Sequence, residues 1–255
     1  MELLLLLLIP FIARWVIRFQ QTGRLFPAFF LSAKHKVFLA KNFEFYQKLP
    51  AKSKQVFERR VALFIGSKKF IPRQMDLVTW EMKVLISAAA IQLTFGFPKV
   101  NLSWFRYILV FPDTFFSKAN QQHHKGEVNP RAKTIVLSWK YFVEGYLESD
   151  GRNLGLHEMA HALRLENRIM NEEYNFLDHE ILEEWELHAK HTMQEIKNGT
   201  EKFFREYGSV NNEEFFAVAV ENFFERPVEF KKVHPLTYQT LCRLLRQDPV
   251  LLEKT

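Results

Sequence analysis

Two segments in the first half of the chain carry the apolar spacing of helices. Between residues 52 and 64, apolar side chains recur every three to four positions, which places them on one helical face. Residues 82–93 are mostly apolar and rich in Ala, Ile and Leu, and Gly96 and Pro98 follow them. Since Gly and Pro end helices, the pattern predicts an amphipathic helix over the first segment and a buried helix over the second.

Two later runs have the composition of β-strands. Residues 104–111 and 134–139 are β-branched and aromatic. Residues 120–130 between them are polar and include Gly126 and Pro130, so they predict a surface loop. The remainder of the chain has mainly helical spacing. We therefore expect an α+β protein that is mainly helical and has a small sheet.

The first residues form an apolar stretch of a different kind. Residues 3–13 contain no charge, and the apolar character continues to residue 17 after Arg14. This length is below the roughly 20 residues that span a bilayer, so crossing would require Arg14 to reach the interface. The segment has no basic start and no small-residue cleavage site, which disfavours a secretory signal peptide.

We interpret residues 1–20 as a hydrophobic N-terminal helix that associates with a membrane through residues 3–17. The alternative is a helix that packs on the domain. Basic residues follow the apolar run, and such flanks tend to stay in the cytoplasm, so we expect the cytoplasmic side of the inner membrane as the location. A basic linker over residues 21–40 and one domain over residues 41–255 complete the predicted organisation.

The positive charge of the chain is concentrated at its start. Residues 1–75 contain 14 Lys/Arg and 3 Asp/Glu, a balance of +11, whereas the remaining residues balance at −5. No helix-turn-helix, zinc knuckle or aromatic RNA-binding signature accompanies this charge. We therefore expect no direct nucleic-acid binding and favour a membrane surface or solubility as the reason for the charge. Cys242 is the only cysteine, which excludes an internal disulfide.

The clearest chemical signal is the pentapeptide His157-Glu158-Met159-Ala160-His161, an HExxH motif with apolar and small residues on both sides. Residues four apart lie on one helical face, so both imidazoles can bind one metal ion while Glu158 lies beside its open side. This is the arrangement of zinc hydrolases. The pentapeptide also arises by chance as two surface histidines on an ordinary helix, so its interpretation depends on the rest of the chain.

Catalytic zinc usually takes three protein ligands and leaves a fourth position for water, so a third ligand is required. The best candidate segment is 207–224, whose apolar body predicts a buried helix that begins with Asn211 or Asn212 as its N-cap. Carboxylates in a buried helix are costly unless they are paired or bound to metal. Glu214 and Glu221 share a face of this helix, and the pattern alone does not choose between them.

Several strings of residues resemble the Mlc titration factor A family of zinc-dependent peptidases. These strings are Phe45-Tyr46-Gln47-Lys48-Leu49-Pro50, Ile108-Leu109-Val110-Phe111-Pro112, Leu137-Ser138-Trp139, Asn153-Leu154-Gly155-Leu156-His157-Glu158-Met159-Ala160-His161, Glu214-Phe215-Phe216-Ala217-Val218-Ala219-Val220-Glu221 with Phe223-Phe224, His234-Pro235-Leu236-Thr237-Tyr238, and Gln247-Asp248-Pro249. They extend over about residues 40–252 in the order of the family.

The resemblance implies a zincin-like α+β metallopeptidase with one Zn²⁺ per chain. The family is similar to the metalloprotease domain of anthrax lethal factor, in which a Glu before Phe-Phe-Ala is the third ligand and a Tyr seven residues earlier faces the substrate. Glu214 and Tyr207 occupy these positions, so Glu221 becomes a residue that supports a ligand or packs the helix. The implied metal ligands are His157, His161 and Glu214, and the implied catalytic residues are Glu158 and Tyr207.

The activity implied by the resemblance is that of an aminopeptidase on short peptides. Glu158 would take the proton of a metal-activated water and deliver it to the leaving amine, and Tyr207 would donate a hydrogen bond to the developing oxyanion. The family takes its name from sequestering a transcriptional repressor of sugar-transport genes. The alternative is therefore a regulatory protein whose partner is a transcriptional regulator and whose peptidase activity is secondary.

One position departs from the family. Its members have an Asp three residues after the second histidine ligand, whereas this chain has Arg164. If that Asp orients a ligand, we expect Glu166 or Glu221 to provide the support instead.

The other polar candidates have ordinary interpretations. His188 and His191 lie on a Glu-rich helix, where a solvated charged face is favoured over a second metal site. Solvation is likewise expected for His123 and His124 in the predicted loop. The strand that ends at Trp139 is either an edge to which a peptide adds as an extra strand or a core strand, and the sequence favours neither.

Overall fold

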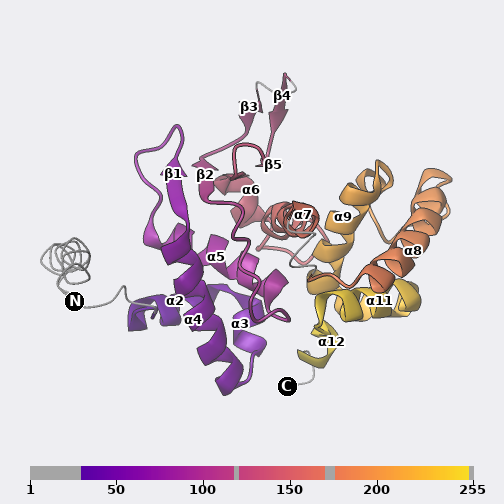
Figure 1. Cartoon of the computed structure of the whole chain (residues 1–255), viewed down its shortest axis with the longest axis horizontal. Helices are drawn as coiled ribbons and strands as arrows, with labels where there is room; N and C mark the ends of the chain where they lie inside the picture. Colours follow the sequence, from indigo (N-terminus) through magenta and orange to yellow (C-terminus); the bar gives the residue numbers. More distant parts are fainter. Residues whose placement is uncertain (1–29, 118–120, 170–175, 253–255) are drawn as a thin grey trace, which may run out of the picture.

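The structure is a computed structural model that describes residues 30–117, 121–169 and 176–252. The predicted hydrophobic helix over residues 1–20 lies outside this part of the chain. Within the described residues, no helix has the length and apolar content needed to cross a bilayer. The fold is α+β and mainly helical, as the sequence predicts (Figure 1).

The elements follow one another along the chain with short connections. In order they are α2 (Ala33–Asn42), α3 (Glu44–Lys48), α4 (Ala51–Ser67), β1 (Lys69–Pro72), α5 (Trp80–Thr94), β2 (Tyr107–Phe111), β3 (Phe115–Ser117), β4 (Gln122–His124), β5 (Gly126–Asn129), β6 (Thr134–Ser138), α6 (Trp139–Glu144), α7 (Leu154–Ile169), α8 (His179–Lys197), the 3₁₀ helix η1 (Glu206–Ser209), α9 (Asn212–Glu225), α10 (Pro227–Val233), α11 (Pro235–Leu245) and α12 (Pro249–Leu252). The helix α2 occupies part of the predicted basic linker, and its Leu39 is fully buried.

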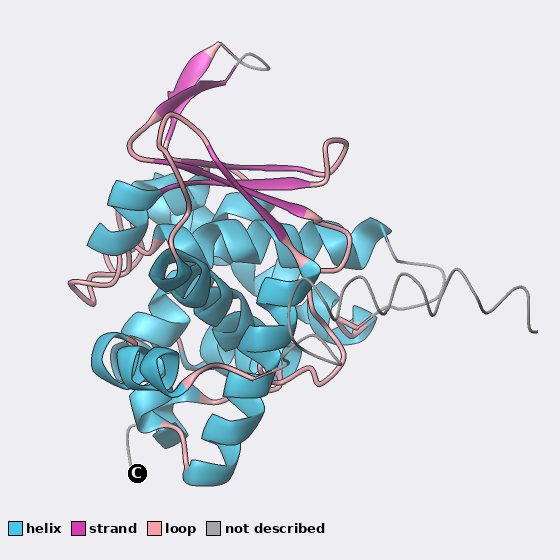
Figure 2. Ribbon diagram, turned by 90° about the vertical axis from the view of Figure 1, so that its left-hand side faces the viewer, coloured by secondary structure: helices cyan, strands magenta, loops and turns pink. Residues whose placement is uncertain are grey.

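A four-stranded sheet forms one layer of the molecule. Its strand order is β1-β2-β6-β5; β1, β2 and β6 are parallel, and β5 is antiparallel to β6. Figure 2 shows the sheet along one side of the helices and the β3–β4 hairpin projecting beyond it. Since Ile135 and Leu137 are fully buried, β6 is a core strand.

This topology decides one open alternative and corrects one expectation. The strand that ends near Trp139 is not a sheet edge, because β5 pairs with its outer side. The segment 120–130 is not simply a loop, because it contains β4 and β5. Its polar composition fits strands that are only partly buried, and the apolar pattern that marks a core strand is missing there.

The helix α5 lies at the centre of the helical layer. Thr79 caps its start, with the hydroxyl oxygen accepting a hydrogen bond from the Met82 N–H at 3.2 Å. All its residues from Ile86 to Thr94 are buried. At its end, the Gln247 side chain donates to the carbonyls of Gln92 and Leu93 at 3.2 and 3.0 Å, so the C-terminal segment closes the last turn of α5.

Two further helices, α7 and α9, pack against each other and carry the HExxH motif and Glu214. The side chain of Asn153 accepts a hydrogen bond from Leu156 N–H at 2.9 Å and so caps the start of α7. Asn211 caps α9 in the same way through the Glu214 N–H at 2.9 Å, which decides between the two predicted N-caps. The α7 helix also contacts β5 and β6, so its polar face lies under the edge of the sheet.

Candidate metal centre

The two histidines of the motif and Glu214 converge on one point. The Nε2 atoms of His157 and His161 are 3.1 Å apart. Glu214 Oε2 lies 3.2 Å from the first of these atoms and 3.4 Å from the second. One ligand atom from each residue falls within 4.8 Å of the others, and within the described residues this is the one group of His, Cys, Asp and Glu with that property.

Glu221 lies on the other side of His157. Its Oε1 is 2.5 Å from His157 Nδ1 and accepts a hydrogen bond from the Nδ1–H, so the Nε2 atom faces the centre. Arg205 donates to both oxygens of Glu221 at 2.7 and 2.8 Å, and the Asn153 N–H adds a third bond at 2.9 Å. Of the two carboxylates that the helical pattern left open, Glu214 faces the metal position and Glu221 supports a ligand.

The electrostatics of the centre favour a positive charge at its middle. Burial opposes protonation of His157, but its bonds with Glu214 and Glu221 outweigh burial and raise its pKa to about 10. Burial raises the pKa of Glu214, yet its bonds with His157 and His161 outweigh that effect and hold the pKa well below the usual range.

Glu158 lies beside the ligands under the edge strand. It is 5% exposed, and burial raises the pKa of its carboxyl. A methyl group at Gly126 would overlap the Glu158 carboxylate, so only glycine lets β5 approach this closely. Because a buried carboxylate with a raised pKa takes up a proton readily, Glu158 has the properties of a general base.

Tyr207 belongs to η1, which precedes α9. Its ring centroid is 6.0 Å from that of His157, and 49% of the residue is exposed. Partial burial and the charge of Glu214 raise the pKa of its hydroxyl to about 12. The hydroxyl therefore keeps its proton at neutral pH and can donate it to a ligand.

Two cavities meet at these residues. One has a volume of about 750 Å³ and the other about 310 Å³, and both are lined by His124, Gly126, His157, Glu158 and Tyr207. The histidines of β4 thus stand in the wall of the cleft, where the sequence interpretation had placed them in a solvated loop. An open cleft on both sides of Glu158 leaves room for an extended chain.

Arg164 does not replace the family Asp as a support. It is 5% exposed, packs over the ring of Phe216 at 5.3 Å and bonds to Glu186 at 3.1 Å. Glu166 instead accepts hydrogen bonds from the backbone of residues 103 and 104. Of the two supports expected from the sequence, Glu221 alone contacts a ligand.

The two histidines of α8 that were candidates for a second metal site form ion pairs along their own helix. His188 lies 3.9 Å from Glu184, and His191 lies 3.3 Å from Glu195, in both cases one turn along α8. His191 is 77% exposed at its side chain. These geometries fit the solvated face that the sequence favoured.

Three residues of the centre escaped the sequence analysis as functional positions. Asn153 had a usable signal, since Asn before a helical run is a typical N-cap. Gly126 had a weak one, since Gly in a strand often marks a close approach. Arg205 had no signal in the sequence. A buried Glu221 needs a cation as its partner, but the sequence does not indicate which basic residue provides that cation.

The residues present fit a zinc ion. Two imidazole nitrogens and one carboxylate oxygen form the donor set of catalytic zinc sites, and the buried Glu214 Oε2 atom faces the two imidazole Nε2 atoms. His157, His161 and Glu214 would hold the ion, and the cleft would supply the open position.

Sequence comparisons agree with this geometry. The family described as "Glucose-regulated metallo-peptidase M90" matches residues 18–246. An uncharacterized protein of Synechocystis is 26% identical over 225 residues, which make up 81% of each chain. Proteins named Mlc titration factor A from Yersinia pestis and Yersinia pseudotuberculosis are 28% identical over 207 residues, 73% of this chain and 74% of theirs.

Proposed function

The chain belongs to the glucose-regulated metallo-peptidase family M90, and from this premise we propose that it is a zinc-dependent aminopeptidase acting on short peptides. The observation that carries the proposal is the convergence of His157, His161 and Glu214 beside buried Glu158. The family implies a metal ion; zinc and the preference for amino ends are our proposals.

A zinc ion held by the three ligands would polarise the scissile carbonyl and make water a better nucleophile. Glu158 accepts the proton of the attacking water and passes it to the leaving amine. Tyr207 donates its hydroxyl proton in a hydrogen bond to the oxygen that gains charge. Glu221 and Arg205 keep the His157 ring in its orientation and tautomer.

The cleft supports an extended peptide as substrate. The outer edge of β5 is unpaired by other described strands, and its residues 126–128 line the smaller cavity. A peptide can hydrogen-bond to such an edge as an added strand. This would place its scissile bond next to Glu158, because Gly126 lies directly against that carboxylate.

The charged side chains that line the larger cavity support the proposal that the substrate is a peptide with a free amino end. Five carboxylates and three basic side chains line it; they are Glu144, Glu148, Asp150, Glu158 and Glu221, and Lys125, Arg152 and Arg205. Glu144, Glu148 and Asp150 are exposed, and their charges can attract the α-ammonium group of a peptide.

The test compares the wild type with Glu158→Gln on a panel of amino-acid anilides. We expect about one equivalent of zinc in both proteins and a loss of turnover of about 10²-fold or more in the variant. Equal turnover in the two proteins would refute the role of Glu158. An endopeptidase substrate cleaved faster than every anilide would refute the preference for amino ends.

A second candidate function is supported by the names of the relatives. Mlc titration factor A is named for the titration of another factor, so a role in binding a transcriptional regulator remains an alternative for this chain. Glu158→Gln also separates the two: a regulatory effect in cells that survives this substitution favours binding, and one that is lost with turnover favours catalysis.

A further inference from the structure

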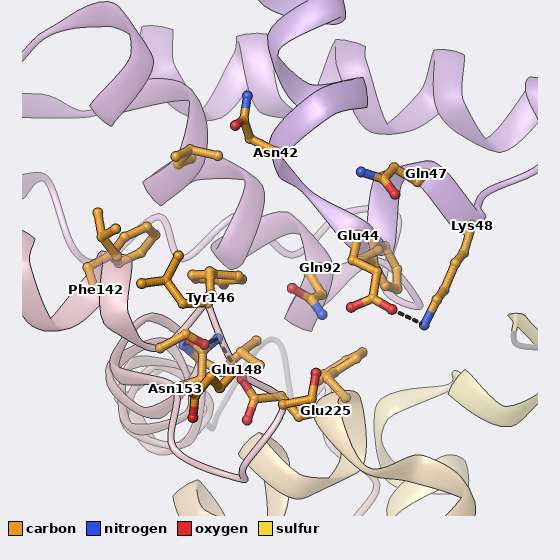
Figure 3. Close-up of a pocket in the computed structure, with 18 of the residues that line it drawn as sticks. Asn42, Glu44, Gln47, Lys48, Gln92, Phe142, Tyr146, Glu148, Asn153 and Glu225 are labelled. Atoms are coloured by element: carbon orange, nitrogen blue, oxygen red, sulfur yellow. Dashed lines mark hydrogen bonds and ion pairs between the residues drawn. The ribbon is translucent and has the colours of Figure 1, made fainter.

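A separate cavity of about 380 Å³ lies behind the start of α7. Its lining contains neither a proposed metal ligand nor Glu158. Figure 3 shows side chains of α2, α3 and α5 on one side and side chains of α6, α9 and the segment 146–153 on the other. The labelled residues are Asn42, Glu44, Gln47, Lys48, Gln92, Phe142, Tyr146, Glu148, Asn153 and Glu225.

Two polar groups of this cavity lack partners among the described residues. Gln92 is 6% exposed, and its Oε1 atom accepts no hydrogen bond there. The buried hydroxyl of Tyr146 forms none either. A buried polar atom without a partner costs about 1–3 kcal/mol. Gln92 Oε1 can only accept, so it favours a ligand that brings a hydrogen-bond donor, and the Tyr146 hydroxyl can donate or accept.

Glu225 adds a carboxylate without a counter-ion. It accepts hydrogen bonds from the Gly151 N–H at 2.9 Å and from the Asn153 side chain at 3.0 Å, and within the described chain it forms no ion pair. Burial, together with the charge of Glu221, raises its pKa to about 8. A cation placed beside it would remove this electrostatic penalty.

The remaining walls also suit a cation. Glu44 and Lys48 form an ion pair at 2.6 Å, so they neutralise each other. Lys41 and Glu148 are exposed, whereas Glu225 is partly buried. The apolar lining is rich in aromatic rings, which attract cations; it includes Phe45, Phe142, Tyr146 and Phe224.

We propose that this cavity binds a small organic cation, a primary ammonium or guanidinium group on a short alkyl chain. Its N–H groups donate to Gln92 Oε1 and to the Glu225 carboxylate, and its alkyl chain packs against the aromatic wall. The volume suits a ligand of this kind, since small-molecule pockets begin at roughly 300 Å³.

The site is close to the metal centre, so the experiment must separate the two. Asn153 bridges them: its side chain donates to Glu225, and its backbone N–H donates to Glu221. An amine could also bind at the acidic cleft, and substitutions confined to either site distinguish these possibilities.

The measurement is the thermal unfolding of the full-length, zinc-loaded protein titrated with butylguanidinium chloride or butylammonium chloride. A ligand that binds only the folded state raises Tm in a saturable manner. We expect this rise with at least one of the two cations. Equal concentrations of 1-butanol, glucose, sodium butyrate or sodium chloride should produce none. Stabilisation by butanol or glucose to the same degree would overturn the cationic class.

Substitutions in the cavity, in the cleft and on the surface show where the cation binds. Glu225→Gln and Gln92→Met should each weaken the affinity by about tenfold or more, which corresponds to about 1.4 kcal/mol. Glu158→Gln in the cleft and Glu180→Gln on the surface of α8 should bind as the wild type does. Unchanged affinity in both cavity variants, or no saturable shift with either cation, would overturn the proposal. Two cavity variants are used so that a folding defect in one leaves the other informative.

Discussion

His157 is held between two carboxylates that have different tasks. Glu214 faces its Nε2 atom, where the metal would bind, and Glu221 accepts a hydrogen bond from its Nδ1–H. The side chain of Glu221 is 1% exposed, so its charge needs the paired hydrogen bonds from Arg205. The orientation of the His157 ring therefore depends on hydrogen bonds that join His157, Glu221 and Arg205, which come from three separate segments.

This division of tasks predicts different results for the two carboxylates. Glu214→Ala should abolish zinc binding, because it removes a ligand. Glu221→Gln should weaken zinc affinity by about 10–100-fold, because it removes a carboxylate that orients a ligand. Competition with a chelator measures both. The matched control is Glu195→Gln, an exposed carboxylate on α8 that should leave affinity unchanged. A full loss of zinc in Glu221→Gln alone would reverse the assignment.

Glu225 predicts a pH effect on stability. Its pKa is raised from 4.5 to about 8, so the folded protein keeps a proton that the unfolded chain releases between these values. Stability from this group is complete below pH 4.5 and is lost as pH rises toward 8, by up to about 1.4 kcal/mol per pH unit. Glu221 and Asp150 contribute to this shift through their charges.

The variant Glu225→Gln removes the titration. Relative to wild type, its free energy of unfolding should therefore rise from pH 5 to pH 8, because only the wild type loses stability over this range; the amide adds a difference that does not change with pH. Urea unfolding at several pH values measures this slope. Parallel curves for the two proteins would show that Glu225 titrates normally.

At the scale of elements, the edge strand β5 contacts the proposed catalytic base, Glu158. Gly126 lies against Glu158, and β5 pairs with β6 to hold that contact. Because residue 126 has no side chain, β5 can lie directly against the Glu158 carboxylate. Its register with β6, Gly126 opposite Leu137, determines which residue of β5 meets the α7 helix.

Gly126→Ala tests this contact. The added methyl group would meet the end of a flexible side chain, so we expect a folded protein with normal zinc content. Displacement of Glu158 should lower kcat by about 10²-fold or more. Gly66→Ala in α4 is the control, because nothing lies within 4 Å of its added methyl group. That variant should keep full turnover and gain about 0.5–1 kcal/mol of stability.

Prediction from sequence succeeded where the signal is periodic. The helices α4, α5, α7 and α9 follow helical spacing of apolar residues, and β2 and β6 follow runs of β-branched and aromatic residues. Prediction from sequence failed for β4 and β5, because these strands consist mainly of polar residues and lack the apolar alternation that marks a strand. For the site, helical spacing brought His157 and His161 together, whereas Arg205 required the tertiary fold.

At the scale of the whole molecule, the N-terminal sequence carries a proposal about location. Residues 3–17 are mostly apolar and basic residues follow them, so we propose that this segment tethers the protein to the cytoplasmic side of a membrane. Cell fractionation should find the full chain with membranes and a version lacking residues 1–20 in the soluble fraction. Equal distribution of both versions would exclude a tether in this segment.

The hydrogen bonds from Gln247 to the last turn of α5 affect the order in which the parts of the molecule can assemble. A ribosome makes the chain from its amino end at roughly 5–20 residues per second. The HExxH motif emerges long before residue 247, but the last turn of α5 still lacks its hydrogen-bond donors at that stage. The α7 helix packs on α5 and on α9, and α9 carries Glu214. The hydrogen bonds that close the last turn of α5, on which α7 packs, can therefore form only after residue 247 has left the ribosome.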